Sequence, residues 1–289
     1  MPSLSTFFPA APAAGRPGDP GLFGPGSAAW RVGRERALLA GGPAALLLQV
    51  AHPLVAAGVA AHSDFGSDPL RRLRGTLDAV LTVVFGDTDQ VRAAAEHVSR
   101  RHRPVRGALV EQVGDLPAGT PYRAEDPDLA LWVFATLVWS AVRVVDGFVR
   151  PVGAAERDAY YRDMTRTAPL FRVRPDDLPE DHHALERYVA EQVAGTLVVD
   201  ATARALAAQV LTPTPPLVPA PLRPVPALLA AGVLPPPVRD AYGLPWRRRE
   251  RAAFAAARHA SRLVVPVLPD RLRTWPHHAV AVDRLRATS

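Results

Sequence analysis

The chain of 289 residues contains no cysteine, lysine, isoleucine or asparagine. The absence of cysteine excludes disulfides, iron–sulfur clusters, thiolate-ligated haem, Cys-type zinc sites and cysteine nucleophiles. The absence of lysine excludes a P-loop lysine, a Schiff base and a Ser-Lys mechanism. Because the codons of lysine, isoleucine and asparagine are AT-rich, we interpret the composition as that of a high-GC bacterial gene. Codon usage, and not function, is then the first explanation for the use of arginine at all 34 basic positions.

The chain is basic but shows no nucleic-acid-binding module. Its formal net charge is +6, with 28 acidic residues spread among the arginines, and its pI is near 10.5. The densest basic run, Arg247 to Arg251, is interrupted by Glu250 and is typical of a solvated helix face. We therefore expect no nucleic acid partner.

The sequence also has little that points to export or membrane insertion. The opening Met-Pro-Ser-Leu-Ser forms neither a basic region nor an apolar leader segment. The longest nearly uncharged apolar stretch, Leu129 to Val142, is shorter than the roughly 20 residues that cross a bilayer. We expect a cytoplasmic protein without a transmembrane segment, and favour a monomer.

Apolar residues recur at helical spacing along most of the chain, and no alternating strand pattern or internal repeat is present. The sequence therefore predicts an all-α, multi-helix globular fold. Residues 1–26 are rich in proline and glycine and are expected to form a flexible arm, with one helical domain over 27–289. Within that domain, the proline-rich residues 212–226 are expected to form an extended connector.

The expected helices differ in how apolar they are. The helix over 128–149 is apolar on nearly every face and is expected to be central. Asp68 and Asp87 are each expected to cap a helix that follows, and these two helices are expected to pack side by side against the central one. Pro53 should kink or divide an apolar helix over 44–61. Further helices are expected over residues 27–36, 154–168, 179–197, 202–211, 226–231, 236–242 and 245–265.

Nine histidines are the main reactive groups, because no Gly-x-Ser-x-Gly elbow is present. The adjacent pairs at 182–183 and 277–278 are expected at the surface. His52 and His62 lie within and at the end of the apolar helix, and His102 continues a stripe of small apolar residues on the Asp87 helix. Each of these three is either a hydrogen-bonded core or capping residue or an iron ligand, since neutral imidazole can bind haem iron in an apolar helical setting.

Arg72 and Thr76 lie one turn apart on the helix after Asp68, and Ala79 and Val83 continue the same row. Without further context, such an arginine usually forms a salt bridge at the edge of the core, and such a threonine has no special role.

Eight short motifs follow one another along the chain. They are Arg34-Glu35-Arg36, residues 41–53, His62-Ser63-Asp64-Phe65, Asp68-Pro69-Leu70-x-Arg72-Leu73-Arg74-x-Thr76, His102-x-x-Val105-x-Gly107, Tyr122-x-Ala124-x-Asp126-Pro127, Trp132-Val133 and residues 239–246. In this order they resemble the catalytic domain shared by MpaB-type proteins and rubber oxygenases (latex clearing proteins), over roughly residues 30 to 275.

The resemblance implies a globin-like helical core that binds haem b and acts with dioxygen on a lipophilic small molecule. Carried over by motif, His102 would be the proximal ligand of the haem iron. Arg72 and Thr76 would be the catalytic pair packed at the haem pocket, where the arginine would hold a propionate or orient dioxygen and the hydroxyl would form a local hydrogen bond.

One position departs from the family pattern. Rubber oxygenases carry a lysine immediately before the threonine, whereas this chain has Gly75 there. Polyisoprene cleavage therefore does not carry over with the resemblance. The leading hypothesis is a haem-b-dependent oxygenase, and the alternative is a non-catalytic haem-binding or lipophile-binding protein that senses or carries its ligand.

Overall fold

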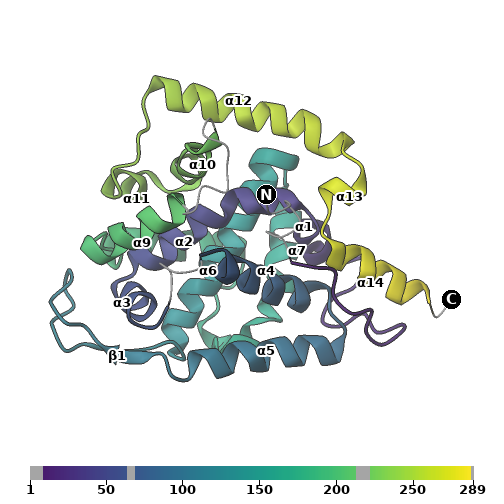
Figure 1. Cartoon of the computed structure of the whole chain (residues 1–289), viewed down its shortest axis with the longest axis horizontal. Helices are drawn as coiled ribbons and strands as arrows, with labels where there is room; N and C mark the ends of the chain where they lie inside the picture. Colours follow the sequence, from purple (N-terminus) through teal and green to yellow (C-terminus); the bar gives the residue numbers. More distant parts are fainter. Residues whose placement is uncertain (1–8, 64–68, 213–221, 288–289) are drawn as a thin grey trace.

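The structure is a computed structural model that describes the backbone of residues 9–63, 69–212 and 222–287, and the side chains of these ranges except 69–74. The described part is mostly helical, as predicted (Figure 1). Its first elements are α1 (Ala28–Gly33), η2 (Arg36–Gly41), α2 (Gly42–Ala51), α3 (Pro53–His62), α4 (Pro69–Phe85), α5 (Thr88–His102), β1 (Arg106–Ala108) and β2 (Pro121–Arg123). The chain continues with α6 (Pro127–Val144), η3 (Val145–Val149), α7 (Ala154–Thr165), η4 (Ala168–Phe171), η5 (Pro175–Asp177), α8 (His182–Gly195) and α9 (Ala201–Leu211). It ends with α10 (Val225–Val233), α11 (Pro236–Ala241), α12 (Arg248–Val264), η7 (Val265–Val267), α13 (Asp270–Arg273) and α14 (Pro276–Arg286).

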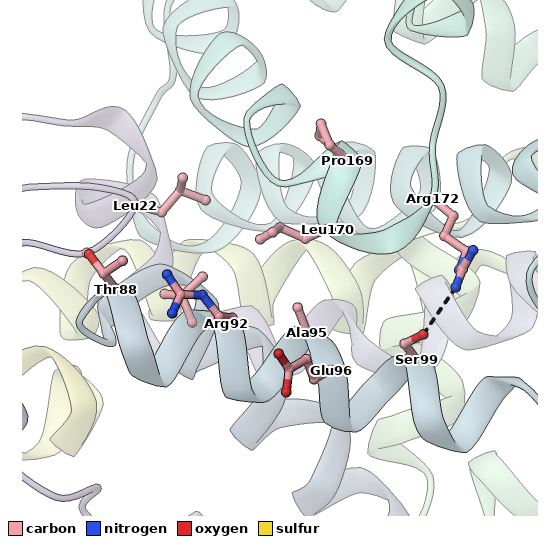
Figure 2. A pocket seen from close by; sticks show the side chains of 11 residues that line it. Leu22, Thr88, Arg92, Ala95, Glu96, Ser99, Pro169, Leu170 and Arg172 are labelled. Carbon is pink, nitrogen blue, oxygen red and sulfur yellow. Dashed lines mark hydrogen bonds between the residues drawn. The ribbon is translucent and has the colours of Figure 1, made fainter.

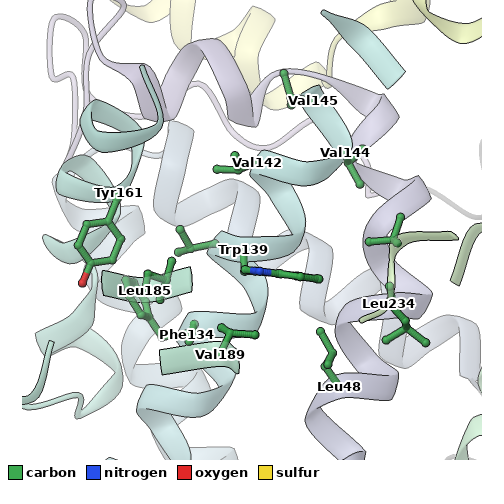
Figure 3. Packing of buried hydrophobic residues seen from close by; sticks show 14 of the residues in the cluster. Leu48, Phe134, Trp139, Val142, Val144, Val145, Tyr161, Leu185, Val189 and Leu234 are labelled. Carbon is green, nitrogen blue, oxygen red and sulfur yellow. The ribbon is translucent and has the colours of Figure 1, made fainter. Parts of the chain in front are cut away.

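The core is built around α6, as its uniform hydrophobicity predicts. Trp139 of α6 is 2% exposed, and Figure 3 shows it with Leu48 of α2, Val189 of α8 and Leu234 around it. Its indole nitrogen donates to Glu186 Oε2 over 3.2 Å, and the guanidinium of Arg143 lies 4.1 Å from the centre of its ring. The polar edge of a large aromatic side chain is thus satisfied while its body fills the core.

Pro53 divides the apolar N-terminal helix, as expected. The segments before and after it, Arg36–Ala51 and α3, meet at 104°. His52 between them has an extended backbone and is the N-cap of α3, so the proline takes the first helical position, where its missing N–H is no loss.

The helices α4 and α5 are joined only by Gly86 and Asp87 and pack side by side, as predicted. Asp87 caps α5 by accepting from the amide of Gln90, whose side chain accepts from the amide of Asp87. The expected packing of this pair against α6 is wrong in the main, because η2, α2 and α8 are the principal neighbours of α6. Besides α5, α4 contacts α1 and α14, while α5 contacts η4. The expected cap at Asp68 lies outside the described residues.

Residues 9–26 are packed against the helices, in contrast to the flexible arm expected from their composition. Phe23 is 2% exposed, the amide of Arg16 donates to Asp87 Oδ2 over 2.6 Å, and Arg284 of α14 donates to the carbonyl of Asp19 over 2.8 Å. Gly21 has φ +67°, and a Cβ there would lie 1.9 Å from the carbonyl oxygen of Gly86. Backbone hydrogen bonds and one aromatic anchor hold this segment, so no apolar period marked it in the sequence.

Two features of the described chain were not expected. Strands β1 and β2 form an antiparallel hairpin, with Gly107 paired to Tyr122, so the fold is helical but not purely so. Its strands have three residues each, too short to show an alternating pattern. The C-terminal helices α13 and α14 are the second feature. Trp275, which precedes α14, is 1% exposed and donates from its amide to the carbonyl of Arg34 over 3.1 Å.

The continuous helix formed by α6 and η3, Pro127–Val149, has the length and hydropathy to cross a membrane. It has 23 residues and a mean hydropathy of 1.6, but 67% of its most apolar window is buried inside the protein. The broken pair η2–α2 and α3 passes the same test only if its two arms are taken together. In this structure α6 is the central helix of the core.

The packing of Phe23 generates a stability prediction. Replacing Phe23 with alanine should lower the free energy of unfolding by about 3 kcal/mol, because a fully buried phenylalanine leaves a cavity when truncated. Val110 is 97% exposed, so Val110→Ala should change stability by less than about 0.5 kcal/mol. Urea denaturation measures both. Equal, small effects would mean that residues 9–26 do not pack on the helices in solution.

Candidate functional site

His102 is the last residue of α5, and its side chain is exposed. It continues the stripe predicted from the sequence, whose burial decreases along the helix. Val91 and Ala95 are buried, Val98 is half-buried and His102 is exposed. The expectation that the side chain of His102 is buried in the core is therefore wrong in this structure. Its role as an iron ligand stays a prediction.

Thr76 lies in the middle of α4 with its side chain exposed, next to Gly75. Among the described residues, no atom lies within 4 Å of the position of a Cβ on Gly75, so the position of the family lysine is not blocked by any of them. Val80 follows Thr76 by one turn and is 38% exposed. Arg72 precedes Thr76 by one turn in α4, and its side chain lies outside the described ones.

The β1–β2 hairpin joins the ends of α3 and α5. Val105, three residues after His102, donates from its amide to the His102 carbonyl and accepts from the amide of Ala124, each over 2.9 Å. His62 at the end of α3 lies 3.1 Å from the carbonyl oxygen of Arg106 through its Nε2. Its ring also meets Tyr122 edge-on at 6.2 Å. The structure thus brings His62 and the end of the His102 motif, Val105 to Gly107, to one hairpin.

Gly107 and Tyr122, which both belong to the motifs, depend on each other sterically in the hairpin. A Cβ on Gly107 would lie 2.5 Å from the hydroxyl oxygen of Tyr122, so only glycine lets the two strands approach with this tyrosine between them. Tyr122 is 6% exposed and lies 3.6 Å from the Cβ position of Gly58 in α3. The sequence named these residues only through the family resemblance and gave no sign of the strands themselves.

His52 and His62 take the two ends of α3, ten residues apart, which corresponds to about 15 Å along a helix. One iron atom could therefore take only one of them as a ligand. Within the described ranges, no group of three His, Cys, Asp or Glu side chains is arranged to hold a metal ion. His52 is 8% exposed, and burial lowers its pKa to about 4. It is a neutral side chain at the N-cap of α3 at physiological pH.

Of the two histidine pairs expected at the surface, only the pair at 182–183 is divided between interior and surface. In the other pair His277 is buried and His278 is half-buried, with its ring centre 5.6 Å from that of Trp30 and 5.5 Å from that of Phe85. His182 is 4% exposed and His277 is 1% exposed, whereas His183 is exposed. His277 Nε2 lies 3.3 Å from Asp78 Oδ1 of α4, and burial lowers its pKa. The surface expectation is therefore wrong for His182 and His277, and His278 is only half-buried. Adjacent helical residues point about 100° apart, so the two members of a pair meet different surroundings.

The buried side of α5 borders an open hollow of about 560 Å³ between the N-terminal segment, α5 and η4. Figure 2 shows Leu22 and Leu170 above the helix and the bond of 3.5 Å between Arg172 and Ser99. The charged groups on its rim are already paired, with Arg172 3.0 Å from Glu125 and Arg92 3.5 Å from Asp89. The hollow therefore offers apolar surface without an uncompensated charge.

The residues around the end of α5 suit haem by their chemistry. His102 offers an imidazole, and Arg101 and Arg103 on either side are exposed and suited to carboxylates. Within the described ranges, Val80 in the middle of α4 and Leu137 of α6 expose apolar side chains, at 38% and 37%. Haem b needs a nitrogen ligand, partners for two propionates and an apolar surface for its ring. The described residues supply each kind of group.

A family model for the catalytic domain of ER-bound oxygenase mpaB/B′ and rubber oxygenase matches residues 30–263. This chain belongs to that family. The match begins in α1 and ends in α12, so it includes α4, α5 and the hairpin between α5 and α6. The resemblance read from the motifs is confirmed.

Two curated mycobacterial proteins are similar to this member of the mpaB and rubber oxygenase family. They are the uncharacterized proteins Mb2261 of Mycobacterium bovis and Rv2237 of Mycobacterium tuberculosis. Each is 30% identical over 241 residues, covering 79% of this chain and 89% of its own length. No solved structure matches the chain.

The buried state of His52 predicts a pH dependence of stability. Its pKa is about 4 in the folded state and about 6.5 in the unfolded state, so the unfolded state binds more protons as pH falls through this window. Stability should decrease between pH 7 and pH 5, by about 2 kcal/mol for this one group. Urea denaturation should show a smaller decrease for His52→Gln, while His183→Gln, at an exposed position, should behave as the unsubstituted protein. The same decrease in all three would contradict the burial of a neutral His52.

Proposed function

We propose that this chain is a haem-b-dependent oxygenase that acts with dioxygen on a lipophilic small molecule. The family match over residues 30–263 carries the proposal, because it places the chain in a family of oxygenase catalytic domains. The chemical fit of the α4–α5 end to haem supports the cofactor. The globin-like character of the haem core belongs to the same proposal.

His102 is the proposed protein ligand of the iron. A porphyrin supplies four nitrogen ligands of its own, so one imidazole at an accessible helix end is a sufficient protein contribution. Haem iron with an imidazole ligand supplies the capacity to activate dioxygen. The position of His102 at the end of α5, next to the turn that leads into β1, fixes its backbone on two elements.

Arg72 and Thr76 are proposed to act from α4. Arg72 would bind a propionate or orient dioxygen, since a guanidinium pairs with anionic oxygen through fixed N–H donors. The Thr76 hydroxyl would donate or accept one hydrogen bond beside it.

Gly75 favours a second candidate, a haem or lipophile carrier without catalysis. The structure leaves room at this position, so the lysine of rubber oxygenases is absent for a reason other than steric exclusion. Dioxygen uptake by the haem-loaded protein with a lipophilic alkene distinguishes the two. Uptake with product formation supports the oxygenase, and tight ligand binding without uptake supports the carrier.

The proposed ligand is tested by His102→Ala. We expect the purified variant to lose haem or to change its Soret spectrum, with and without dithionite, because the iron loses its protein ligand. His97→Ala is the matched control, since His97 is exposed on the same helix and lies about 140° around its axis. If folded wild-type protein binds no haem when supplied with hemin, His102 is a structural residue and the oxygenase proposal fails.

The role of Arg72 is tested against its neighbour. Arg72→Ala should lower haem retention or activity more than Arg71→Ala, because Arg72 shares a helical row with Thr76 whereas Arg71 lies about 100° away. Haem content per protein and turnover are the measurements. Equal losses in the two variants would assign Arg72 to a general surface role.

A further inference from the structure

The excess positive charge of the chain lies in one segment. Residues 247–273 contain eight arginines and two acidic residues, so their net charge of +6 equals that of the whole chain. The remaining residues contain 26 arginines and 26 acidic residues and are neutral. This segment covers α12, η7 and α13, which lie along one edge of the molecule (Figure 1).

The same segment exposes large apolar side chains. Four of the nine exposed large hydrophobic residues in the described ranges fall within ten positions at the end of α12 and in η7 and α13. They are Leu263, Val264, Val267 and Leu272, at 62%, 50%, 77% and 54% exposure. Along α12, Ala252, Ala256 and Leu263 follow one another on the outward face at spacings of four and seven residues. The exposed side chains of residues 248–272 are called the α12 surface below.

The inward arginines of the segment have structural partners. Arg258 and Arg262 donate to the carbonyls of Gly147 and Asp146 in η3, and Arg273 donates to Glu35, which is 1% exposed. These bonds attach α12 to the end of α6 and Arg273 to the segment between α1 and η2, and they leave the outward arginines, such as Arg248 and Arg271, at the surface. The segment is thus held rigidly with its basic and apolar groups facing out.

We propose that the α12 surface docks on a bilayer that contains anionic lipids. Arginines attract the anionic headgroups, and the apolar side chains at one end enter the boundary between headgroups and acyl chains. Both acidic residues of the segment lie at its margins, Glu250 in the first turn of α12 and Asp270 at the start of α13. The exposed arginines gather at the start of α12, over 247–251, with Arg271 in α13, and the exposed large apolar side chains lie over 263–272. The surface is therefore basic at one end and apolar at the other.

Two other occupants fit the α12 surface less well. A second copy of the chain would bring the same positive surface against itself, and like charges at close range oppose such pairing. A nucleic acid would pair with the arginines but would leave the exposed leucine and valine side chains without apolar contacts. An anionic bilayer satisfies both kinds of group.

Flotation of the full-length protein with vesicles tests this proposal. We expect binding to vesicles of phosphatidylcholine with phosphatidylglycerol and little binding to phosphatidylcholine alone. Binding should fall at about 1 M salt, where the Debye length is about 3 Å. Arg248→Gln with Arg271→Gln should weaken binding by about fivefold per arginine.

The apolar contribution is tested separately. Leu263→Glu with Val267→Glu should reduce binding by at least about tenfold, because two apolar side chains become anionic at the bilayer surface. Val110→Glu is the matched control for charge and exposure, and Arg92→Gln is the control for the arginines, at 67% side-chain exposure on α5. Circular dichroism and thermal melting establish that the variants fold, which the high exposure of the replaced residues favours.

Three outcomes would overturn the proposal. The first is wild-type protein that does not float with anionic vesicles, and the second is binding that both double variants leave unchanged. The third is a dimer that Leu263→Glu with Val267→Glu dissociates, in a protein that vesicles do not retain, which would assign the surface to a second copy. Haem content is measured in parallel, so a failure here is distinguishable from a failure of the oxygenase proposal.

Discussion

The arrangement of the helices depends on the burial of α6, because this helix carries apolar side chains around nearly all of its circumference. Eleven of its 18 residues are buried, including Trp132 and Trp139. Each fully buried large apolar side chain contributes about 1.5–3 kcal/mol, so no face of this helix can be left to water without a large loss of stability. The requirement is met by η2 and α2 on one part of its surface and by α8 on another. Helices with a single apolar stripe, such as α4 and α5, pack further out.

At the end of α6, the buried backbone carbonyl groups also need hydrogen-bond donors. The π-helical turn η3 leaves the carbonyls of Asp146, Gly147 and Phe148 without helical partners, and α12 supplies them. Ser261 donates to Phe148 over 2.7 Å, while two arginines donate to the other carbonyls. The position of α12 is therefore set by the termination of the core helix, and only its outward side is left for other contacts.

The sequence predicted the elements that local physical chemistry determines. Proline at position 53, the capping residues at 87 and 90 and the uniform hydrophobicity of α6 each act over a few residues, and the structure has the expected break, cap and central helix. The features it missed depend on contacts between distant segments. Phe23 is buried against helices far along the chain, and Gly107 is required by Tyr122 across the hairpin. The motif resemblance named Gly107 and Tyr122 but did not show why they occur together.

His102 illustrates a limit of helical periodicity. A stripe specifies the direction in which a side chain points, and α5 follows its stripe from Val91 to His102. Burial also requires a neighbouring element at the same height along the helix, which the stripe does not encode. The proposed iron ligand therefore lies at the rim of the core. In Figure 1, α5 and α12 lie along opposite edges of the molecule. A bilayer docked on the α12 surface would consequently leave the end of α5 facing away from the lipid, so docking would concentrate the protein near lipophilic substrates without covering its proposed haem site.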